Sequence, residues 1–301
     1  MLENNPTPRS DPSHREPKII RSPRAQRLAA SLPERYVFQR VIGKGGAAYV
    51  ILADDLIRKH PVAVKILRPE IAASVGETRF HREIEILSHL DHPNILPLLD
   101  YGSVNENIFF FTMPVVEGDT LQGRIRREGQ LSLRDAISIA GDVANALDHA
   151  HSRGLIHRDI KPANILLSEG RTLVADFGIA RAMAVEPSEQ ITASGVSLGT
   201  PEYMSPEQAG GIRELDSRCD VYALGCMVYE MLVGEPPFTG PTEQVIFAMH
   251  LKVPPRSIRL VRPDIPTGVD FAVSKALSKS RSQRFYSAGN FVKALVEGSL
   301  S

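Results

Sequence analysis

The stretch 157–178 constrains this chain more than any other part of the sequence. It begins His-Arg-Asp-Ile-Lys-Pro-Ala-Asn, continues with the apolar run Ile-Leu-Leu, and ends in Asp-Phe-Gly. Pro162 argues against a continuous helix, which favours a loop, a short hairpin and a second loop. Asp159, Asn164 and Asp176 present side-chain oxygen atoms that suit a hard cation such as Mg²⁺, which proteins usually share with a substrate phosphate. The stretch therefore predicts a cation site beside a lysine.

A glycine-rich turn joins two apolar stretches near the start of the chain. Residues 36–42 and 49–53 both read as strands, and the turn between them contains Gly43, Gly45 and Gly46. Because glycine has no side chain, the backbone N–H groups of such a turn can approach phosphates closely. Taken alone, the pattern favours an ordinary tight turn. A dinucleotide-binding fold would need a helix after the glycines, whereas strand residues follow here.

A lysine lies in the middle of the next predicted strand, residues 61–67. Lys65 is surrounded there by residues of buried type, where an unpaired ammonium group would be costly. The following helix, 77–90, has apolar residues at helical spacing and offers two glutamates as partners. Glu83 faces the edge of the apolar stripe, whereas Glu85 lies about 200° around the helix from it. We therefore predict that Glu83 is the partner.

The strand-rich part of the chain ends near Pro114. Two further strands are predicted at 95–99 and 107–114, and helices follow, among them the strongly apolar segment 219–233. Pro114 has no N–H but keeps its carbonyl, and Val116 has both groups. One acceptor and one donor at this junction would suit a planar heterocycle such as adenine.

Composition excludes several classes of protein. The chain has 301 residues, 43% of them apolar, which is enough for one bilobal domain or two ordinary domains. Its 35 acidic and 35 basic residues balance, so net charge gives no support to nucleic-acid or membrane binding. No apolar run approaches the roughly 18 residues needed to span a bilayer, and no signal region begins the chain. Cys219 and Cys226 are expected to be small buried residues in a reducing compartment, and a cytoplasmic location is expected.

The first 33 residues differ from the rest. Residues 1–33 are rich in proline, serine and arginine, with six basic and three acidic residues and few periodic apolar positions. Such a segment buries too little surface to offset its ordering entropy. We predict a disordered basic tail, and a solvated tail is favoured over one that binds an acidic partner or carries phosphorylation sites.

The motifs above recur together, in order, in one family. From about Tyr36 to Leu295 the sequence resembles the protein serine/threonine kinases, most closely the bacterial kinases of eukaryotic type. The resemblance implies an α+β bilobal fold. A small N-lobe, 34–116, would contain a five-stranded antiparallel sheet and one helix, and a larger C-lobe, 117–298, would be mostly helical.

The resemblance also implies an ATP site covered by the glycine-rich turn. Lys65 would hold the α- and β-phosphates and pair with Glu83 in the active state. Met113 would be the gatekeeper beside the adenine-binding hinge residue Val116. The residues expected to contact ATP are Ile42, Gly43, Lys44, Gly45, Gly46, Val50, Ala63, Lys65, Met113, Val116 and Leu166.

The catalytic roles implied by the resemblance fall on the stretch 157–178. Asp159 would receive the proton of the substrate hydroxyl, and Lys161 would stabilise the transferring phosphoryl group. Asn164 and Asp176 would coordinate Mg²⁺, with Mn²⁺ as an alternative. A lysine two residues after the aspartate is the serine/threonine pattern, so the γ-phosphate would pass to serine and threonine hydroxyls of protein substrates.

Several other residues would support this site. Thr200 is expected to contact Asp159 and Lys161, Glu207 to pair with Arg284, and Asp220 to anchor the backbone of the catalytic loop. The sequence departs from the family pattern at Ala48, where the glycine-rich loop usually has a third glycine. It also lacks the asparagine-proline pair that usually precedes the late arginine, Arg284.

Charges suggest how such an enzyme would be regulated. Arg158, Arg181 and Arg79 are predicted to converge on a phosphorylated activation loop, because arginines order a segment by pairing with phosphate. The predicted autophosphorylation sites are Thr192 and Ser194, with a transient homodimer for the reaction. The alternative is that the three arginines are a solvated face.

Two other functions remain to be weighed. A pseudokinase, a scaffold on the same fold, would usually lack Lys65, Asp159 or Asp176, and all three are present. A small-molecule phosphotransferase should lack the segment 199–207, which would dock a peptide. Many bacterial relatives continue into a membrane helix and a sensor domain, so the chain is expected to be either a stand-alone cytosolic kinase or a fragment.

Overall fold

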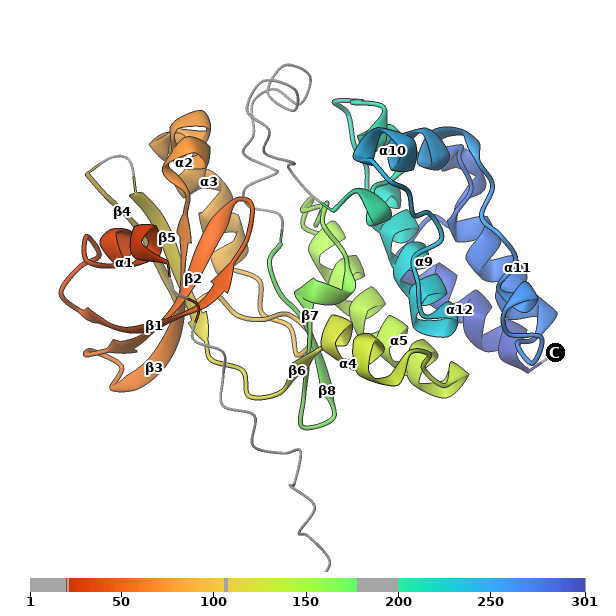
Figure 1. Cartoon of the computed structure of the whole chain (residues 1–301), viewed down its shortest axis with the longest axis horizontal. Helices are drawn as coiled ribbons and strands as arrows, with labels where there is room; N and C mark the ends of the chain where they lie inside the picture. Colours follow the sequence, from red (N-terminus) through yellow and green to blue (C-terminus); the bar gives the residue numbers. More distant parts are fainter. Residues whose placement is uncertain (1–19, 21, 106–107, 178–199, 301) are drawn as a thin grey trace, which may run out of the picture.

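The computed structural model describes residues 20, 22–105, 108–177 and 200–300. Figure 1 shows these residues in two lobes, a sheet-rich lobe in red to yellow and a helical lobe in green to blue. Asp176 and Phe177 lie where the two lobes meet.

The strands of the first lobe form one antiparallel sheet in the order β1-β2-β3-β5-β4. This confirms the five-stranded sheet implied by the resemblance. The single helix expected in residues 34–116 is an underestimate, because the described residues of that range contain two helices and a third precedes them. The elements are α1 (Pro23–Ala29), β1 (Tyr36–Lys44), β2 (Ala48–Asp55), β3 (His60–Leu67), α2 (Pro69–Val75), α3 (Glu77–Ser88), β4 (Asp100–Val104) and β5 (Ile108–Pro114).

Both faces of this sheet are covered, which explains the nearly continuous apolar run of β3. Val62 and Val64 belong to the apolar cluster that contains α1, whereas Ala63 and Leu67 belong to the cluster that contains the buried face of α3. Successive residues of a strand point to opposite faces of the sheet. Lys65 therefore lies on the α3 face, which is the face that meets the second lobe.

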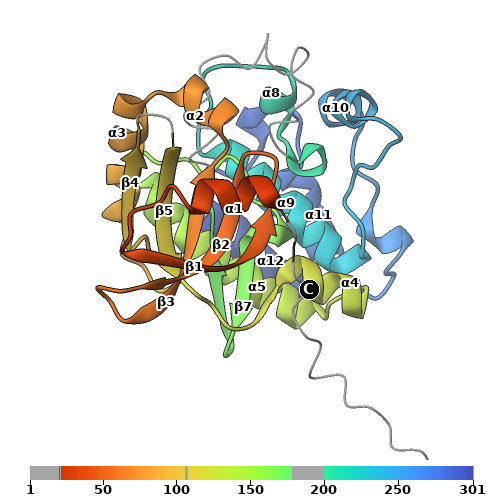
Figure 2. The same cartoon turned by 60° about the vertical axis from the view of Figure 1, so that its left-hand side comes forward.

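The prediction that residues 1–33 form a disordered tail is wrong for its last third. Helix α1 lies across the outer face of the sheet (Figure 2), with Ala25, Leu28 and Leu32 buried against it. Ser22 caps the helix by accepting a hydrogen bond from the N–H of Ala25 at 3.4 Å. Composition predicted disorder because the few apolar residues are diluted among charged ones, but their helical spacing places them on one face. Residues 1–19 and 21 lie outside the described part of the chain.

Shortening a docked side chain of α1 tests this contact. Leu28→Ala should lower the free energy of unfolding by about 2 kcal/mol, because the substitution removes buried apolar atoms and leaves a cavity. Gln26→Ala, on the exposed side of the same helix, is the matched control. Urea denaturation of both variants gives the comparison, and equal stabilities would show that α1 does not pack on the sheet.

The strand predicted at 95–99 is also wrong. Residues 95–98 instead run alongside the second lobe, where Leu96 N–H donates to the carbonyl of Val174 at 2.9 Å. The N–H of Val174 donates in turn to the carbonyl of Asn94 at 2.8 Å. An apolar run of this length has no property that tells which partner it will pair with.

The second lobe is organised around one buried helix, α9 (Arg218–Val233). Every residue of α9 from Cys219 onward is buried, including both cysteines, which are free. A helix that is apolar on all sides belongs in the centre of a helical lobe, and α9 packs against α5, α11 and α12. In the described part of the chain, no helix combines the length and apolarity that a membrane crossing requires.

The remaining elements of this lobe surround α9 or line the junction (Figure 1). A small sheet has the order β6-β7-β8. The elements are β6 (Asp119–Thr120), α4 (Leu121–Glu128), α5 (Leu133–His151), η1 (Pro162–Asn164), β7 (Ile165–Ser168), β8 (Arg171–Val174), η2 (Pro201–Tyr203), α8 (Pro206–Ala209), α10 (Glu243–Lys252), η3 (Ile258–Leu260), α11 (Thr267–Ala276), η4 (Arg281–Gln283) and α12 (Ala288–Ser299), where η denotes a 3₁₀ turn.

Candidate active site

The loop between α5 and β7 brings together the polar residues that the sequence singled out. The ammonium group of Lys161 donates to Asp159 Oδ2 and to Thr200 Oγ1, both at 2.8 Å. The side-chain amide of Asn164 donates to the Asp159 carbonyl at 2.8 Å and to its Oδ2 at 3.2 Å. One carboxylate, one cation and one hydroxyl thus form a single hydrogen-bonded group.

Asp220, at the start of α9, fixes the backbone of this loop. Its carboxylate accepts the N–H groups of His157 and Arg158, each at 2.8 Å, as the resemblance implied. Burial would raise the pKa of the Asp220 carboxyl, but the His151 hydrogen bond at 2.8 Å and the backbone donors hold the pKa below its ordinary value. Arg158 has a φ of 67°, a left-handed conformation that is costly unless its surroundings fix it.

His157 connects this loop to the Asp-Phe-Gly motif. The ring is fully buried, and its Nδ1 accepts the N–H of Asp159 at 3.2 Å. Burial lowers the pKa of His157, so the ring is neutral, with the proton on Nε2, which donates to the Ala175 carbonyl at 3.1 Å. The ring also lies 4.6 Å from that of Phe177. His157 therefore holds the two loops in register.

A backbone hydrogen bond brings together the segments that carry the two predicted metal ligands, Asn164 and Asp176. The N–H of Ala175, the residue before Asp176, donates to the carbonyl of Asn164 at 2.9 Å. Asp176 has a φ of 60°, so the chain turns sharply there. Among the described residues no group of three His, Cys, Asp or Glu side chains is arranged to hold a metal. A cation here would draw further oxygen ligands from a phosphate and from water, as Mg²⁺ commonly does.

The expected partner of Lys65 is not the observed one. Lys65 Nζ lies 2.6 Å from Asp176 Oδ1, and the described residues contain no ion pair between Lys65 and Glu83. Glu83 is half-buried on α3, and Glu85 is exposed. The burial of these two side chains is therefore consistent with the choice of Glu83 over Glu85. The Lys65–Glu83 pair, which was expected for the active state, is not formed here, and Asp176 takes the place of Glu83.

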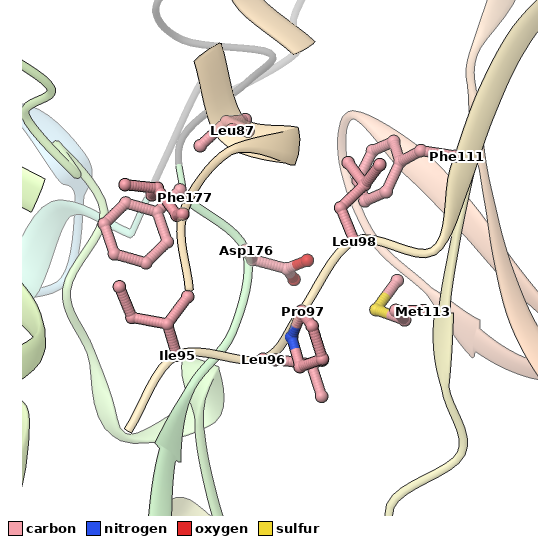
Figure 3. A pocket seen from close by; sticks show the side chains of 10 residues that line it. Leu87, Ile95, Leu96, Pro97, Leu98, Phe111, Met113, Asp176 and Phe177 are labelled. Carbon is pink, nitrogen blue, oxygen red and sulfur yellow. The ribbon is translucent and has the colours of Figure 1, made fainter. Parts of the chain in front are cut away.

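A pocket between the lobes adjoins the Lys65–Asp176 pair. It is lined by Leu87 of α3 and Leu90 just after it, by Phe111 and Met113 of β5, and by Asp176 with its neighbour Phe177. In Figure 3 the Phe177 ring lies on one side of the Asp176 carboxylate and Met113 lies on the other. Phe111 is the cross-strand neighbour of Lys65. The pocket thus lies beside the strand that carries Lys65 and beside the last turn of the helix that carries Glu83.

The predicted nucleotide-contacting residues lie around the β1–β2 turn and the junction of the lobes. A Cβ atom on Gly43 would lie 3.2 Å from Val50 Cβ, so a larger residue would crowd the turn. Gly45 N–H donates to the carbonyl of Ala48 at 2.9 Å, closing a turn that also holds Lys44 and Gly46. The apolar members Ile42, Val50, Ala63 and Met113 belong to one cluster. Leu166, on β7, and Val116, after β5, are half-buried.

The scaffold pair at the base of the second lobe is present. Arg284 donates two hydrogen bonds of 2.7 Å to the two carboxylate oxygens of Glu207, and both side chains are buried. Two supporting contacts were missed in the sequence. The side chain of Gln208 donates to the Arg158 carbonyl at 2.9 Å, and His151 bonds to Asp220 rather than only filling the core. Neither contact has a signal in sequence spacing, because each depends on how helices meet.

The regulatory residues are described only in part. Arg79 lies half-buried on α3, and Arg158 lies in the catalytic loop. Arg181, Thr192 and Ser194 lie outside the described residues. The convergence of arginines on a phosphorylated segment therefore stays a prediction.

Comparison with known proteins gives a consistent result. The family model for the protein kinase domain matches residues 36–294. The chain is 38% identical over 270 residues to serine/threonine-protein kinase PknB of Mycolicibacterium smegmatis, covering 88% of this chain and 43% of that protein. It is 40% identical over 257 residues to PrkC of Bacillus subtilis, covering 84% of this chain and 39% of that protein. The chain thus spans less than half the length of these relatives.

Solved structures agree with the sequence matches. The crystal structure of the PknI kinase domain from Mycobacterium tuberculosis superposes with a TM-score of 0.69 at 29% identity, covering 90% of this chain and 99% of that one. The fold, the order of the motifs and the match to the family model all point to the same family, and all three extend over both lobes. This chain belongs to the protein kinase family.

Proposed function

We propose that this chain is a serine/threonine protein kinase that transfers the γ-phosphate of ATP to hydroxyl groups of proteins. The observation that carries the proposal is the pair of 2.8 Å hydrogen bonds from Lys161 to Asp159 and Thr200. Through them a carboxylate that can accept a proton and a cation that can stabilise phosphate charge meet the segment that follows Thr200. Such chemistry depends mainly on positioning and charge neutralisation.

Each residue of the group has a distinct task in this reaction. Asp159 orients the acceptor hydroxyl and takes its proton, and the Asn164 hydrogen bond holds that carboxylate in place. Lys161 neutralises charge on the phosphoryl group as it moves. Lys65 must release Asp176 to bind phosphate oxygens, and Glu83 then becomes its carboxylate partner.

The donor set at the metal position fits Mg²⁺. The Asn164 amide uses its NH₂ group on Asp159, which leaves its oxygen available, and Asp176 supplies carboxylate oxygens. Hard oxygen donors of this kind suit Mg²⁺ or Mn²⁺ better than softer metals. A bound Mg²⁺ supplies charge neutralisation to the phosphates.

Removing the metal carboxylate should raise the Mg²⁺ concentration that the enzyme needs and should remove most of the activity. We expect Asp176→Asn to lower the transfer rate by about 100-fold or more, because a positioned charge interaction in the transition state is lost. The control is Asp54→Asn, which removes an exposed carboxylate that accepts a hydrogen bond from Gln39. This variant should behave as wild type. Transfer rates measured across a Mg²⁺ series give the answer, and an unchanged Mg²⁺ dependence in Asp176→Asn would contradict the assignment.

A transfer assay separates this function from a scaffold role on the same fold. The wild-type chain is incubated with γ-labelled ATP, a generic basic protein and Mg²⁺ or Mn²⁺, with an EDTA control. A kinase labels the protein only when metal is present. Absence of labelling with either metal would support the pseudokinase alternative.

Regulation and location are proposed on the same basis. We propose autophosphorylation at Thr192 and Ser194 in a transient homodimer, and a cytoplasmic location, which suits two unpaired cysteines. Phosphopeptide mapping after incubation with Mg-ATP tests the first point. An absence of phosphate between residues 185 and 200 would contradict it.

A further inference from the structure

A lysine that forms no ion pair with a carboxylate of the described residues lies between α9 and α10. Lys279, just after α11, is partly buried, and the described residues contain no acidic side chain in an ion pair with it. Its ammonium group lies 4.2 Å from the centre of the Phe238 ring and 5.7 Å from that of Tyr222. It donates to the Met249 carbonyl at 3.3 Å and to the Tyr222 hydroxyl at 3.4 Å. Burial lowers the pKa of Lys279 to about 8.

The Tyr222 hydroxyl continues the chain of contacts into α10. It lies 2.8 Å from Nδ1 of His250, and both side chains are fully buried. Because an ammonium group can only donate, the Tyr222 oxygen accepts from Lys279 and its own proton points to His250 Nδ1. Nδ1 is then the acceptor, and the proton of the neutral imidazole is on Nε2. Burial lowers the pKa of His250 to about 3, so the ring stays neutral.

The far side of the His250 ring faces η2. Nε2 is buried and has no hydrogen-bond partner among the described residues, although the backbone of Glu202 and Pro201 opposes the lowering of the ring's pKa by burial. Helix α10 packs against η2 and α8. The three side chains thus form a directed row from Lys279 to the turn that begins one residue after Thr200.

We propose that Lys279 is a positioning residue for the protein substrate, acting through Tyr222 and His250 on the Pro201–Tyr203 turn. This rests on the proposed kinase function, because the turn adjoins Thr200 and through it Lys161 and Asp159. The ammonium group fixes the direction of both hydrogen bonds, and so fixes which imidazole nitrogen carries the proton that faces the turn. The row is separate from the nucleotide site, so it should affect the protein substrate and leave ATP binding unchanged.

Lys279→Met tests the role without removing bulk. Replacing a buried charge with an apolar side chain of similar length often leaves stability unchanged or raises it. We expect the KM for a peptide substrate to rise about 5- to 10-fold, the factor that one hydrogen bond of ordinary strength contributes, with an unchanged KM for ATP. Tyr222→Phe should give the same result, and the double variant should add little to either. Lys275→Met, which removes a lysine placed over the Phe285 ring, is the control.

A second readout does not depend on catalysis. The N–H groups of Tyr203 and Met204 donate within η2, to the carbonyls of Thr200 and Pro201 at 3.2 Å. Hydrogen exchange at these two amides should accelerate about 5- to 10-fold in Lys279→Met, the same hydrogen-bond factor. Unchanged exchange would overturn the proposal. Faster exchange in a chain that transfers no phosphate would retain the positioning role and reject the kinase function.

The dependence on pH gives a signature that a purely structural lysine lacks. The groups facing Lys279 are Tyr222 and Cys226 of α9, Arg284, and His250 of α10. As pH rises through about 8 the ammonium group is lost, and the peptide KM of wild type should rise while that of Lys279→Met stays level. Stability should not fall over the same range, because the folded state binds this proton less tightly than the unfolded state does. A parallel pH profile in the two proteins would contradict the proposal.

Discussion

Asp159→Asn is expected to lower the rate of phosphoryl transfer by about 10²- to 10⁴-fold, the usual contribution of a positioned general base. The asparagine has the same shape and can still accept the hydrogen bond from Lys161, so the loop should keep its geometry. It cannot take the proton of the acceptor hydroxyl. Transfer from γ-labelled ATP measures the rate, and a thermal shift on adding Mg-ATP should show that nucleotide binding is retained.

A matched control separates the role of this carboxylate from a general effect of losing a charge. Asp264→Asn removes a carboxylate that pairs with Arg262 and has a 63% exposed side chain. Its transfer rate should equal that of wild type. An Asp159→Asn enzyme with a rate within threefold of wild type would remove Asp159 from the proposed mechanism.

Arg284→Met is expected to reduce the free energy of unfolding by about 3–5 kcal/mol, because it leaves the Glu207 carboxylate buried without its partner. The two residues share two hydrogen bonds of 2.7 Å, and their side chains are 0% and 3% exposed. The double variant Glu207→Leu/Arg284→Met should recover much of the loss, since no buried charge is then left unpaired. Denaturant unfolding of the single and double variants measures both values.

The exposed pair Lys293–Glu297 provides the comparison. Both side chains are more than half exposed, so Lys293→Met should change stability by less than about 0.5 kcal/mol. A cost below about 1 kcal/mol for Arg284→Met would mean that the Glu207–Arg284 pair does not hold α8 to the base of the lobe.

The sequence predicted the site best where the functional residues lie close together along the chain. Asp159, Lys161 and Asn164 lie within six residues, so one loop conformation brings them together and the motif itself predicts the contact. Asp220 and Arg284 were placed by the resemblance, and both make the expected bonds. These roles follow from local backbone geometry and from charges that must be paired when buried.

The parts that could not be predicted depend on how elements meet. The partner of Lys65 is Asp176 of the second lobe, and no local pattern encodes which carboxylate a lysine will meet across two lobes. Helix α1 is only seven residues long, too short to be stable without the sheet on which it packs. Its apolar residues were too few for composition to indicate a fold. Lys279 gave no signal, because its contacts come from α9, α10 and the segment between them.

The most direct test of the central claim uses three peptides that differ only at the acceptor, as serine, threonine or tyrosine. Each is incubated with the wild-type chain, γ-labelled ATP and Mg²⁺, and the labelled residue is identified by mass spectrometry. The arrangement of Asp159, Lys161 and Thr200 predicts phosphate on serine and threonine, none on tyrosine, and only background labelling with Asp159→Asn. Labelling of no peptide above the Asp159→Asn background, or labelling confined to tyrosine, would contradict the account.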